Sequence, residues 1–371
     1  MSVEETGVAY YGVMYPDRAV KDFEEMVEYG CNAVLLGWSE FDAWFWHPNV
    51  LKLIEEARNH GLRVYVDPWA WGKIFGGEPT SVFLQNHADL RQVSAKTGKV
   101  LPSACFNTEE FRQYVAGNIE RMAEESDADY FFWDEPHYAS FWRLEDGSIQ
   151  ILDLDDWACA CETCKKLFKD EYGYEMPNQM NDDVASFRQN KIIEFLSEIS
   201  SAVKRADPKK GVCTCLLPLS HPLIGITDWE GVASIRNVDM LSTDPYWVAL
   251  QQYGLVPQGF EEGINWYRNT LDELIKLAEK HGKKTQAWVQ AFNIPNGREE
   301  EIIKGIEIAK EKNIYSIFAW PYRAGEGSVL ASDRTTTLWR MIGEAYKRVR
   351  KTPKAWRNRI AEKKSSTMSH F

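Results

Sequence analysis

The sequence predicts an α/β fold in which parallel strands alternate with helices. Short runs rich in β-branched and aromatic residues recur along the 371 residues, and segments with the apolar repeat of an amphipathic helix lie between them. The expected strands are residues 7–15, 32–38, 63–69, 128–135, 211–218, 238–247, 284–292 and 314–322. Eight such units predict a (β/α)8 TIM barrel. A doubly wound open sheet is the alternative, but no glycine-rich phosphate loop follows the first strand.

The expected helices are residues 19–30, 50–61, 108–126, 187–206 and 270–282, and several of these segments end at a glycine. Glycine favours the left-handed conformation that closes the last helical turn. We find no repeat, low-complexity tract or linker that divides the chain. We therefore expect one barrel domain over residues 1–350, followed by a tail over residues 351–371 that is first basic and then polar.

Composition limits the possible partners. The net charge of −12 argues against nucleic acid or an anionic membrane, since either partner requires a basic surface. Neutral and cationic ligands stay open. The first residues lack the order of a signal peptide, and no apolar run approaches the roughly 20 residues that span a bilayer. We expect a cytoplasmic protein, and the sequence is compatible with a homo-oligomer.

Aromatic residues are abundant, with 15 Trp, 16 Tyr and 17 Phe. About half of them are expected to fill a large core. Others fall near predicted strand ends, where an aromatic face can stack on a sugar ring. These are Trp38, Trp44, Trp46, Trp69, Trp71, Trp133, Trp247, Trp288 and Trp320.

Four of the seven cysteines form a pattern that suggests a metal site: Cys105, followed by Cys159, Cys161 and Cys164 in "CACETC". Thiolates at this short spacing can converge on one ion, and a further cysteine closes a tetrahedral site. Four sulfurs leave no open position, so the ion is structural and would fix the insert after the fourth strand against the segment after the third. Disulfides are the alternative, but a cytoplasmic chain keeps thiols reduced. The other three cysteines are interpreted as buried small residues.

The stretch "YFFWDEPHY", residues 130–138, delivers Asp134 and Glu135 to the end of a buried strand. In a (β/α)8 barrel the carboxyl ends of the strands carry the catalytic residues. Carboxylates in this place seldom help folding, so we interpret the pair as chemical. The alternative is a surface turn with ordinary carboxylates.

Three motifs carry a resemblance to a known family: "SACFNTEEFRQYV", the fourth-strand "WDEP" and "WACACETCKKLFKDEYG". Over roughly residues 100–175 they resemble the catalytic barrel of the glycoside hydrolase family 42 β-galactosidases. The resemblance implies that Glu135 is the proton donor. It also implies that Zn²⁺ is held by Cys105, Cys159, Cys161 and Cys164.

Two positions depart from the family pattern. Asp134 stands where the wider clan of retaining barrel glycosidases has Asn. The clan carries its nucleophilic Glu at the end of the seventh strand, where Gln286, Trp288 and Gln290 share one face. The end position is therefore Gln290, and a carboxamide cannot form the glycosyl ester.

Three mechanisms then stay open. Asp244, after the sixth strand, is the leading base for an inverting reaction, followed by Asp67 and then by Glu40 and Asp42. A substrate N-acetyl group can instead supply the nucleophile, with Asp134 orienting it and Tyr246 assisting. In the third case the barrel binds carbohydrate without turnover.

The expected pocket residues are Asp67, Trp69, His137, Tyr246, Trp288, Gln290 and Trp320. His137 follows a proline, so a solvated imidazole is its alternative. A metal-dependent hydrolase ranks last because no His-x-His follows the first strand. We expect a hydrolase of carbohydrate metabolism that cleaves a glycosidic bond in an oligosaccharide or small glycoside.

Overall fold

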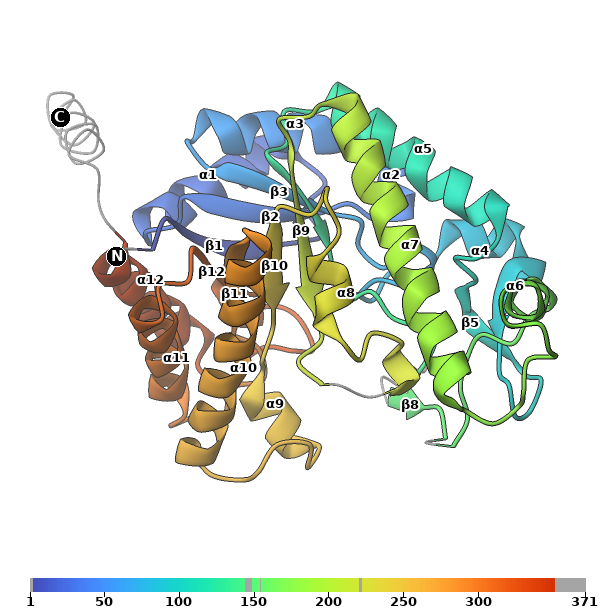
Figure 1. The fold of residues 1–371 in the computed structure, drawn as a ribbon. Coiled ribbons are helices and arrows are strands. Elements are labelled where there is room, and N and C mark those ends of the chain that lie inside the picture. The colour runs from blue at the N-terminus through green and yellow to red at the C-terminus, as the bar shows by residue number, and fades with distance from the viewer. Residues whose placement is uncertain (1–2, 144–148, 154, 220–221, 351–371) are drawn as a thin grey trace, which may run out of the picture.

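The computed structural model describes residues 3–143, 149–153, 155–219 and 222–350. Eight parallel strands close into a barrel in the order β1-β12-β11-β10-β9-β6-β3-β2 (Figure 1). The barrel strands are β1 (Glu5–Tyr10), β2 (Ala33–Gly37), β3 (Arg63–Asp67), β6 (Tyr130–Trp133), β9 (Gly211–Leu216), β10 (Met240–Thr243), β11 (Lys284–Gln290) and β12 (Ser316–Trp320). The predicted (β/α)8 barrel is confirmed. The tail expected over residues 351–371 lies outside the described residues.

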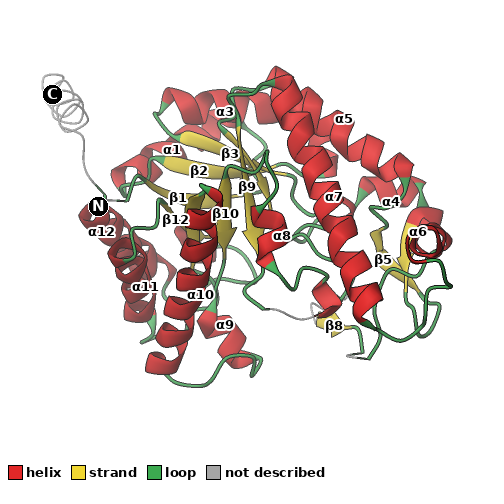
Figure 2. Cartoon of the chain, in the orientation of Figure 1, coloured by secondary structure: helices red, strands yellow, loops and turns green. Residues whose placement is uncertain are grey.

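Long helices cover the outside of the barrel (Figure 2). They are α1 (Pro16–Glu28), α3 (His47–Asn59), α5 (Glu109–Glu125), α7 (Asp182–Ala206), α10 (Phe260–His281), α11 (Glu299–Glu311) and α12 (Thr335–Val349). The helices expected from the sequence correspond to α1, α3, α5, α7 and α10. No helix among the described residues combines the length and the apolar composition needed to cross a membrane.

Local signals in the sequence set the ends of these helices. Proline occupies the first turn of α1, where its missing N–H costs no helical hydrogen bond. At the start of α7 the side chain of Asn181 accepts a hydrogen bond from Val184 N at 2.9 Å. Helix α10 ends at Gly282, whose φ of 65° is the left-handed conformation that glycine adopts easily.

The interior of the barrel is filled rather than open. Side chains including Tyr65, Phe132, Trp288 and Phe318 pack together inside it. Toward the amino ends of the strands, buried Glu5 accepts a hydrogen bond from Tyr65 Oη at 2.6 Å and pairs with Arg63. The amino ends of the strands are thus occupied by paired side chains, and in this fold the carboxyl ends carry the functional residues.

Two inserts enlarge one side of the barrel, at the right of Figure 1. The first follows β3 and contains η1 (Trp71–Lys73), α4 (Val82–Asn86), η2 (Ala88–Leu90) and the antiparallel pair β4 (Arg91–Val93) and β5 (Val100–Ala104). The second follows β6 and contains the pair β7 (Phe141–Arg143) and β8 (Ile149–Ile151) and then α6 (Glu162–Tyr172). The remaining short elements are α2 (Glu40–Trp44), η3 (Pro222–Ile224), α8 (Trp229–Ala233), α9 (Trp247–Gln252) and η4 (Tyr322–Gly325).

Candidate active site and cysteine cluster

Four carboxyl groups converge at the carboxyl ends of three barrel strands. Asp67 is the last residue of β3, Asp134 and Glu135 follow β6, and Asp244 follows β10. Asp244 and Glu135 lie close enough that Glu135 raises the pKa of Asp244. The pair that the sequence singled out after the fourth strand therefore meets carboxyl groups from two other strands.

Burial and mutual repulsion change the acidity of this group. Burial is the largest cause that raises the pKa of Asp67, Asp134 and Asp244 above its usual range. The negative charge of Glu135 raises each of the three further. The site thus favours the protonated forms of these three aspartic acids.

Two buried carboxylate oxygens of this group have no hydrogen-bond partner among the described residues. They are Oδ1 of Asp67, a residue with 0% exposure, and Oδ1 of Asp244, which is 5% exposed. The other oxygen of Asp67 accepts a hydrogen bond from Tyr11 Oη at 3.3 Å. Since buried polar atoms are nearly always paired in proteins, these two oxygens are available to a ligand hydroxyl or to a water molecule.

The absence of a side chain at Gly76 makes room for the carboxyl groups of Asp134 and Glu135. A Cβ atom at this position would lie 2.4 Å from Asp134 Oδ2 and 3.4 Å from Glu135 Oε2. Glu135 has a φ of 41°, a left-handed conformation that costs a non-glycine residue about 1–3 kcal/mol. The next turn holds it there, because His137 N donates to Ile74 O at 3.0 Å and His137 Nδ1 lies 2.5 Å from Glu135 O.

Five aromatic side chains form an arc beside these carboxyl groups. Ring centroids are 4.5 Å apart for Trp69 and Tyr11, and 6.3 Å for Tyr11 and Trp320. The arc continues through Phe292, which lies 4.8 Å from Trp320 and 5.2 Å from Tyr246. Sugar rings bind between aromatic faces and carboxylates, so this arrangement suits a carbohydrate.

A cavity of about 510 Å³ opens beside the carboxyl pair. Glu135 and His137 line it together with Gly76, Glu78 and Ser103. His137 is 5% exposed, so the solvated imidazole is not what the structure contains. Burial lowers the pKa of His137, which favours the neutral ring.

Two residues expected in the pocket lie deeper. Trp288 packs inside the barrel, and its Nε1 donates to Gln286 Oε1 at 3.1 Å. Gln290 is fully buried, with Oε1 accepting from Ala249 N at 3.0 Å and Nε2 donating to Phe292 O at 2.9 Å. Backbone groups occupy both the oxygen and the nitrogen of this carboxamide, so we assign Gln290 no contact with a substrate.

Two further carboxylates that the sequence offered as bases hold local structure. Glu40 accepts hydrogen bonds from Gly72 N at 2.6 Å and Phe83 N at 2.5 Å. Asp42 accepts from Ser39 N at 2.9 Å and closes the capping box of α2. Their hydrogen bonds explain their presence without catalysis.

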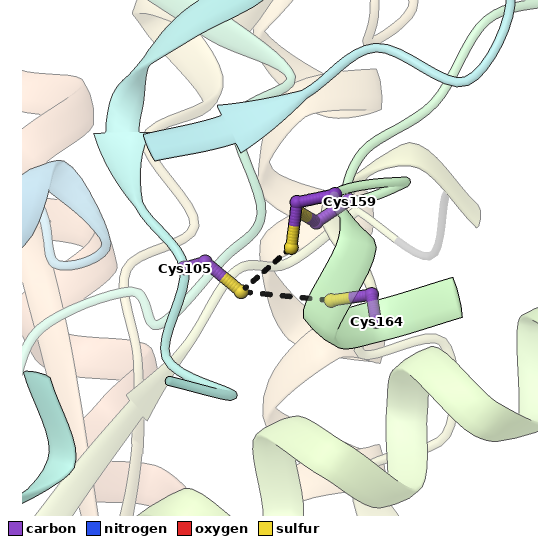
Figure 3. Close-up of side chains that lie close together, drawn as sticks. Cys105, Cys159 and Cys164 are labelled. Atoms are coloured by element: carbon purple, nitrogen blue, oxygen red, sulfur yellow. Dashed lines mark hydrogen bonds between the residues drawn. The ribbon is translucent and has the colours of Figure 1, made fainter. Parts of the chain in front are cut away.

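The four cysteines of the predicted metal site lie together, with their sulfur atoms all within 4.8 Å of one another. Cys105 follows β5, Cys161 caps α6 and Cys164 lies in its first turn. Figure 3 shows Cys105 pointing toward Cys159 and Cys164 from the opposite segment. Asn107 Nδ2 donates to Cys164 Sγ at 3.2 Å. This donor set suits a soft cation, and the cluster joins the two inserts as predicted.

Two buried side chains connect this cluster to the loop that carries Glu135. Gln92 Nε2 donates to Ala104 O, next to Cys105, and its Oε1 accepts from Ala139 N, both at 2.9 Å. Arg188 donates to Ala158 O at 2.5 Å and stacks 4.3 Å from the centre of the Tyr138 ring. The segment after Glu135 is thus held by residues that also hold the cysteine segments.

Comparison with solved structures identifies barrels of the same shape. The barrel resembles those of β-galactosidases. A β-galactosidase from the haloarchaeon Halorubrum lacusprofundi matches with a TM-score of 0.64 and 15% identity, covering 92% of this chain and 58% of that chain. A GH42 β-galactosidase from G. stearothermophilus matches with a TM-score of 0.68 and 14% identity, over 95% and 58%.

A shorter neighbour matches along almost its whole length. The endo-1,4-β-mannanase from Rhizomucor miehei has a TM-score of 0.59 and 11% identity, over 93% of this chain and 95% of that chain. No family model matches the sequence, and no curated protein matches it. These likenesses confirm the barrel that the family resemblance implied, and the chain spans little more than half the length of the β-galactosidases.

The sequence did not point to four residues of the site: Tyr11, Gly76, Glu78 and Phe292. Tyr11 is the first residue after β1, and Phe292 is the second residue after β11. Their positions at strand ends could therefore have identified them from the sequence. Gly76 and Glu78 lie in an insert whose path no periodicity fixes.

Proposed function

We propose that the chain is a glycosidase that hydrolyses an oligosaccharide or a small glycoside. One observation carries the proposal: carboxyl groups from three strand ends face an arc of aromatic rings at the barrel mouth. A glycosidase needs a proton donor, a second group that stabilises or attacks the sugar centre, and a surface for the ring. The site offers each of these, and the barrel is one that glycoside hydrolases use.

Glu135 is the proposed general acid. It lines the cavity, where a glycosidic oxygen can approach it, and Asp244 at the end of β10 lies close to it. Asp134 lies beside it and does not line the cavity. Its negative charge, when present, favours protonation of its neighbours.

The closeness of Asp244 to Glu135 bears on the choice of base. In inverting glycosidases the two carboxyl groups lie roughly 6.5–9.5 Å apart, because the attacking water stands between them and the sugar. Asp244 is close enough to Glu135 for that neighbour to raise its pKa, so we assign Asp244 to supporting the acid rather than to activating water. Asp67, with one free oxygen and a hydrogen bond from Tyr11, is then the proposed base.

Substrate assistance is the second mechanism that the site supports. Asp134 would orient an N-acetyl group, and Tyr246, at the end of the aromatic arc, would donate to it. The two mechanisms differ in the anomer formed first. Proton NMR of the first product from aryl α- and β-glycosides, including N-acetylhexosaminides, gives inverted product for an Asp67 base and retained product for substrate assistance.

A carbohydrate-binding barrel without turnover is the competing function, and Gln290 favours it. This residue stands where retaining barrels carry their nucleophile, and backbone groups occupy both ends of its amide. Binding of oligosaccharides with no hydrolysis on the same array, across several pH values, would support this alternative and defeat the glycosidase.

We further propose that the cysteine cluster holds a structural Zn²⁺. Cys105, Cys159, Cys161 and Cys164 would supply four sulfur ligands, and the ion would contribute folding energy rather than chemistry. The buried setting of three of the four thiols and the hydrogen bond from Asn107 to Cys164 support this. Metal analysis of protein purified without chelators should find about one zinc per chain.

A further inference from the structure

A second aromatic surface lies at the mouth of the barrel, outside the candidate active site. Phe41, Trp44 and Phe45 on and after α2 are exposed by 44%, 68% and 54%. Their ring centroids are 5.3–5.7 Å apart. We call these three residues the α2 patch. Contiguous exposed aromatic residues cost solubility, so they usually mark a binding surface.

The α2 patch borders a cavity of about 250 Å³. Phe41, Trp46 and Trp69 line this cavity, and Ser39 and Asp42 give it polar atoms. Small-molecule sites usually have volumes from roughly 300 Å³ upward. This cavity is slightly smaller, so it has room for about one sugar ring. Aromatic walls with a few polar groups are what a neutral polyol requires, since its ring faces are apolar and its edges carry hydroxyls.

Two side chains, Trp69 and Tyr11, lie between this cavity and Asp67. Trp69 lines the cavity, and its ring lies 4.5 Å from that of Tyr11, whose Oη donates to Asp67. Gly37 permits this close packing, because a Cβ there would lie 2.3 Å from Tyr11 Cδ1 and 3.3 Å from Trp69 Cε3. A chain with one sugar beside Asp67 can therefore extend across Trp69 toward the α2 patch.

We propose that the α2 patch and its cavity form a distal subsite that binds a further sugar residue of a carbohydrate chain. The inference rests on the proposed glycosidase function and deepens it, since it makes an oligosaccharide rather than a small glycoside the preferred substrate. Continuity with the active site through Trp69 favours a glycan over a second copy of the chain as the occupant.

The test compares 4-nitrophenyl β-glycosides of galactose, glucose, mannose and N-acetylglucosamine, each as the mono-, di- and trisaccharide. For the sugar that reacts, kcat/KM should rise about tenfold or more from the mono- to the trisaccharide. Trp44→Ala and Phe41→Ala should reduce this ratio at least about fivefold. A ratio unchanged in both variants would overturn the inference while the glycosidase stands.

Tyr253→Ala is the matched control, because Tyr253 is an aromatic residue of 64% exposure just after α9. Helix α9 follows β10, which lies four strands from β2 in either direction round the barrel. The control should leave the ratio between tri- and monosaccharide as it is in the unmodified chain.

A binding measurement separates failure of the subsite from failure of the glycosidase. Gel retardation by galactomannan, laminarin and glycol chitosan should be seen in the unmodified chain and weakened in Trp44→Ala, even if no glycoside reacts. Equal retardation of the unmodified chain and Trp44→Ala, or no retardation of either, would contradict the proposed subsite. Sedimentation equilibrium must show the same mass for both; a dimer that Trp44→Ala dissociates would assign the patch to a second copy instead.

Discussion

Gly76 lies against the side chain of Asp134, with space for hydrogen but not for a methyl group. A Cβ on Gly76 would approach Asp134 Oδ2 to 2.4 Å, closer than real Cβ contacts allow. The nearest atom is the end of a side chain, so Asp134 must move while the backbone stays. We predict that Gly76→Ala lowers kcat about tenfold or more, because small displacements of reacting groups are costly, with little change in melting temperature.

Gly117 in α5 offers a control for this substitution. A Cβ there meets nothing within 4 Å, and alanine in a helix is more stable than glycine by about 0.5–1 kcal/mol. Gly117→Ala should raise the melting temperature slightly and leave kcat unchanged. Full kcat in Gly76→Ala would show that catalysis does not depend on the position of the Asp134 side chain beside Gly76.

Glu135→Gln should abolish hydrolysis of substrates with poor leaving groups and largely spare binding. The amide keeps the size of the side chain but has no proton to give, and general acids contribute about 10²–10⁴ in rate. Activated aryl glycosides need less protonation, so their kcat should fall less. Rates with a series of leaving groups, together with calorimetric binding of a disaccharide, measure both effects. Equal loss of binding and turnover would indicate a structural role.

The sequence predicted the barrel because each of its strands is a separate apolar run. It also predicted that Asp67, Asp134 and Asp244 end three strands, and the structure brings them together. Gln286 and Trp288 share one face of the seventh strand, since Trp288 packs inside the barrel and its Nε1 donates to Gln286 Oε1. The contact of Gln290 with Ala249 N could not be predicted, because it depends on the path of the segment after β10.

The pH dependence of stability should show the raised pKa of Asp67. An unfolded aspartate releases its proton near pH 4, whereas the folded residue keeps its proton to higher pH because of burial and the charges of Glu135 and Glu78. Between these values the unfolded state binds fewer protons, so the free energy of unfolding falls as pH rises. This residue's contribution is therefore complete below about pH 4 and is lost as pH rises through the folded pKa.

Asp67→Asn removes this contribution. The variant should gain stability relative to the unmodified chain as pH rises from about 4 to 8, measured by urea unfolding at each pH. Tyr11, which donates to the carboxylate, can donate to the new amide oxygen. Asp17→Asn, at a side chain 75% exposed, is the control for removing a carboxylate at the surface. A stability difference for Asp67→Asn that stays constant with pH would contradict the prediction.

Cys161→Ser should remove the metal and lower the melting temperature more than it lowers activity per folded molecule. Zinc binding is coupled to folding of the segments it joins, and Cys161 is less buried than its three partners, so the substitution disturbs packing little. A chelator should destabilise the unmodified chain and have no effect on the variant. Cys31→Ser, at a buried cysteine outside the cluster, should stay sensitive to the chelator.

Gln92 should position Glu135 without touching the substrate. Its side chain bridges Ala104 O and Ala139 N with two hydrogen bonds of 2.9 Å, and Ala139 lies four residues after Glu135. Gln92→Met keeps a similar volume but loses both bonds, leaving a buried N–H and C=O unpaired at a cost of about 1–3 kcal/mol each. We expect kcat to fall, KM to change little and zinc content to stay the same. A Gln92→Glu variant restores only the acceptor for Ala139 N, so it should recover kcat in part. Recovery of stability without recovery of kcat would show that Gln92 supports the fold and does not position the acid.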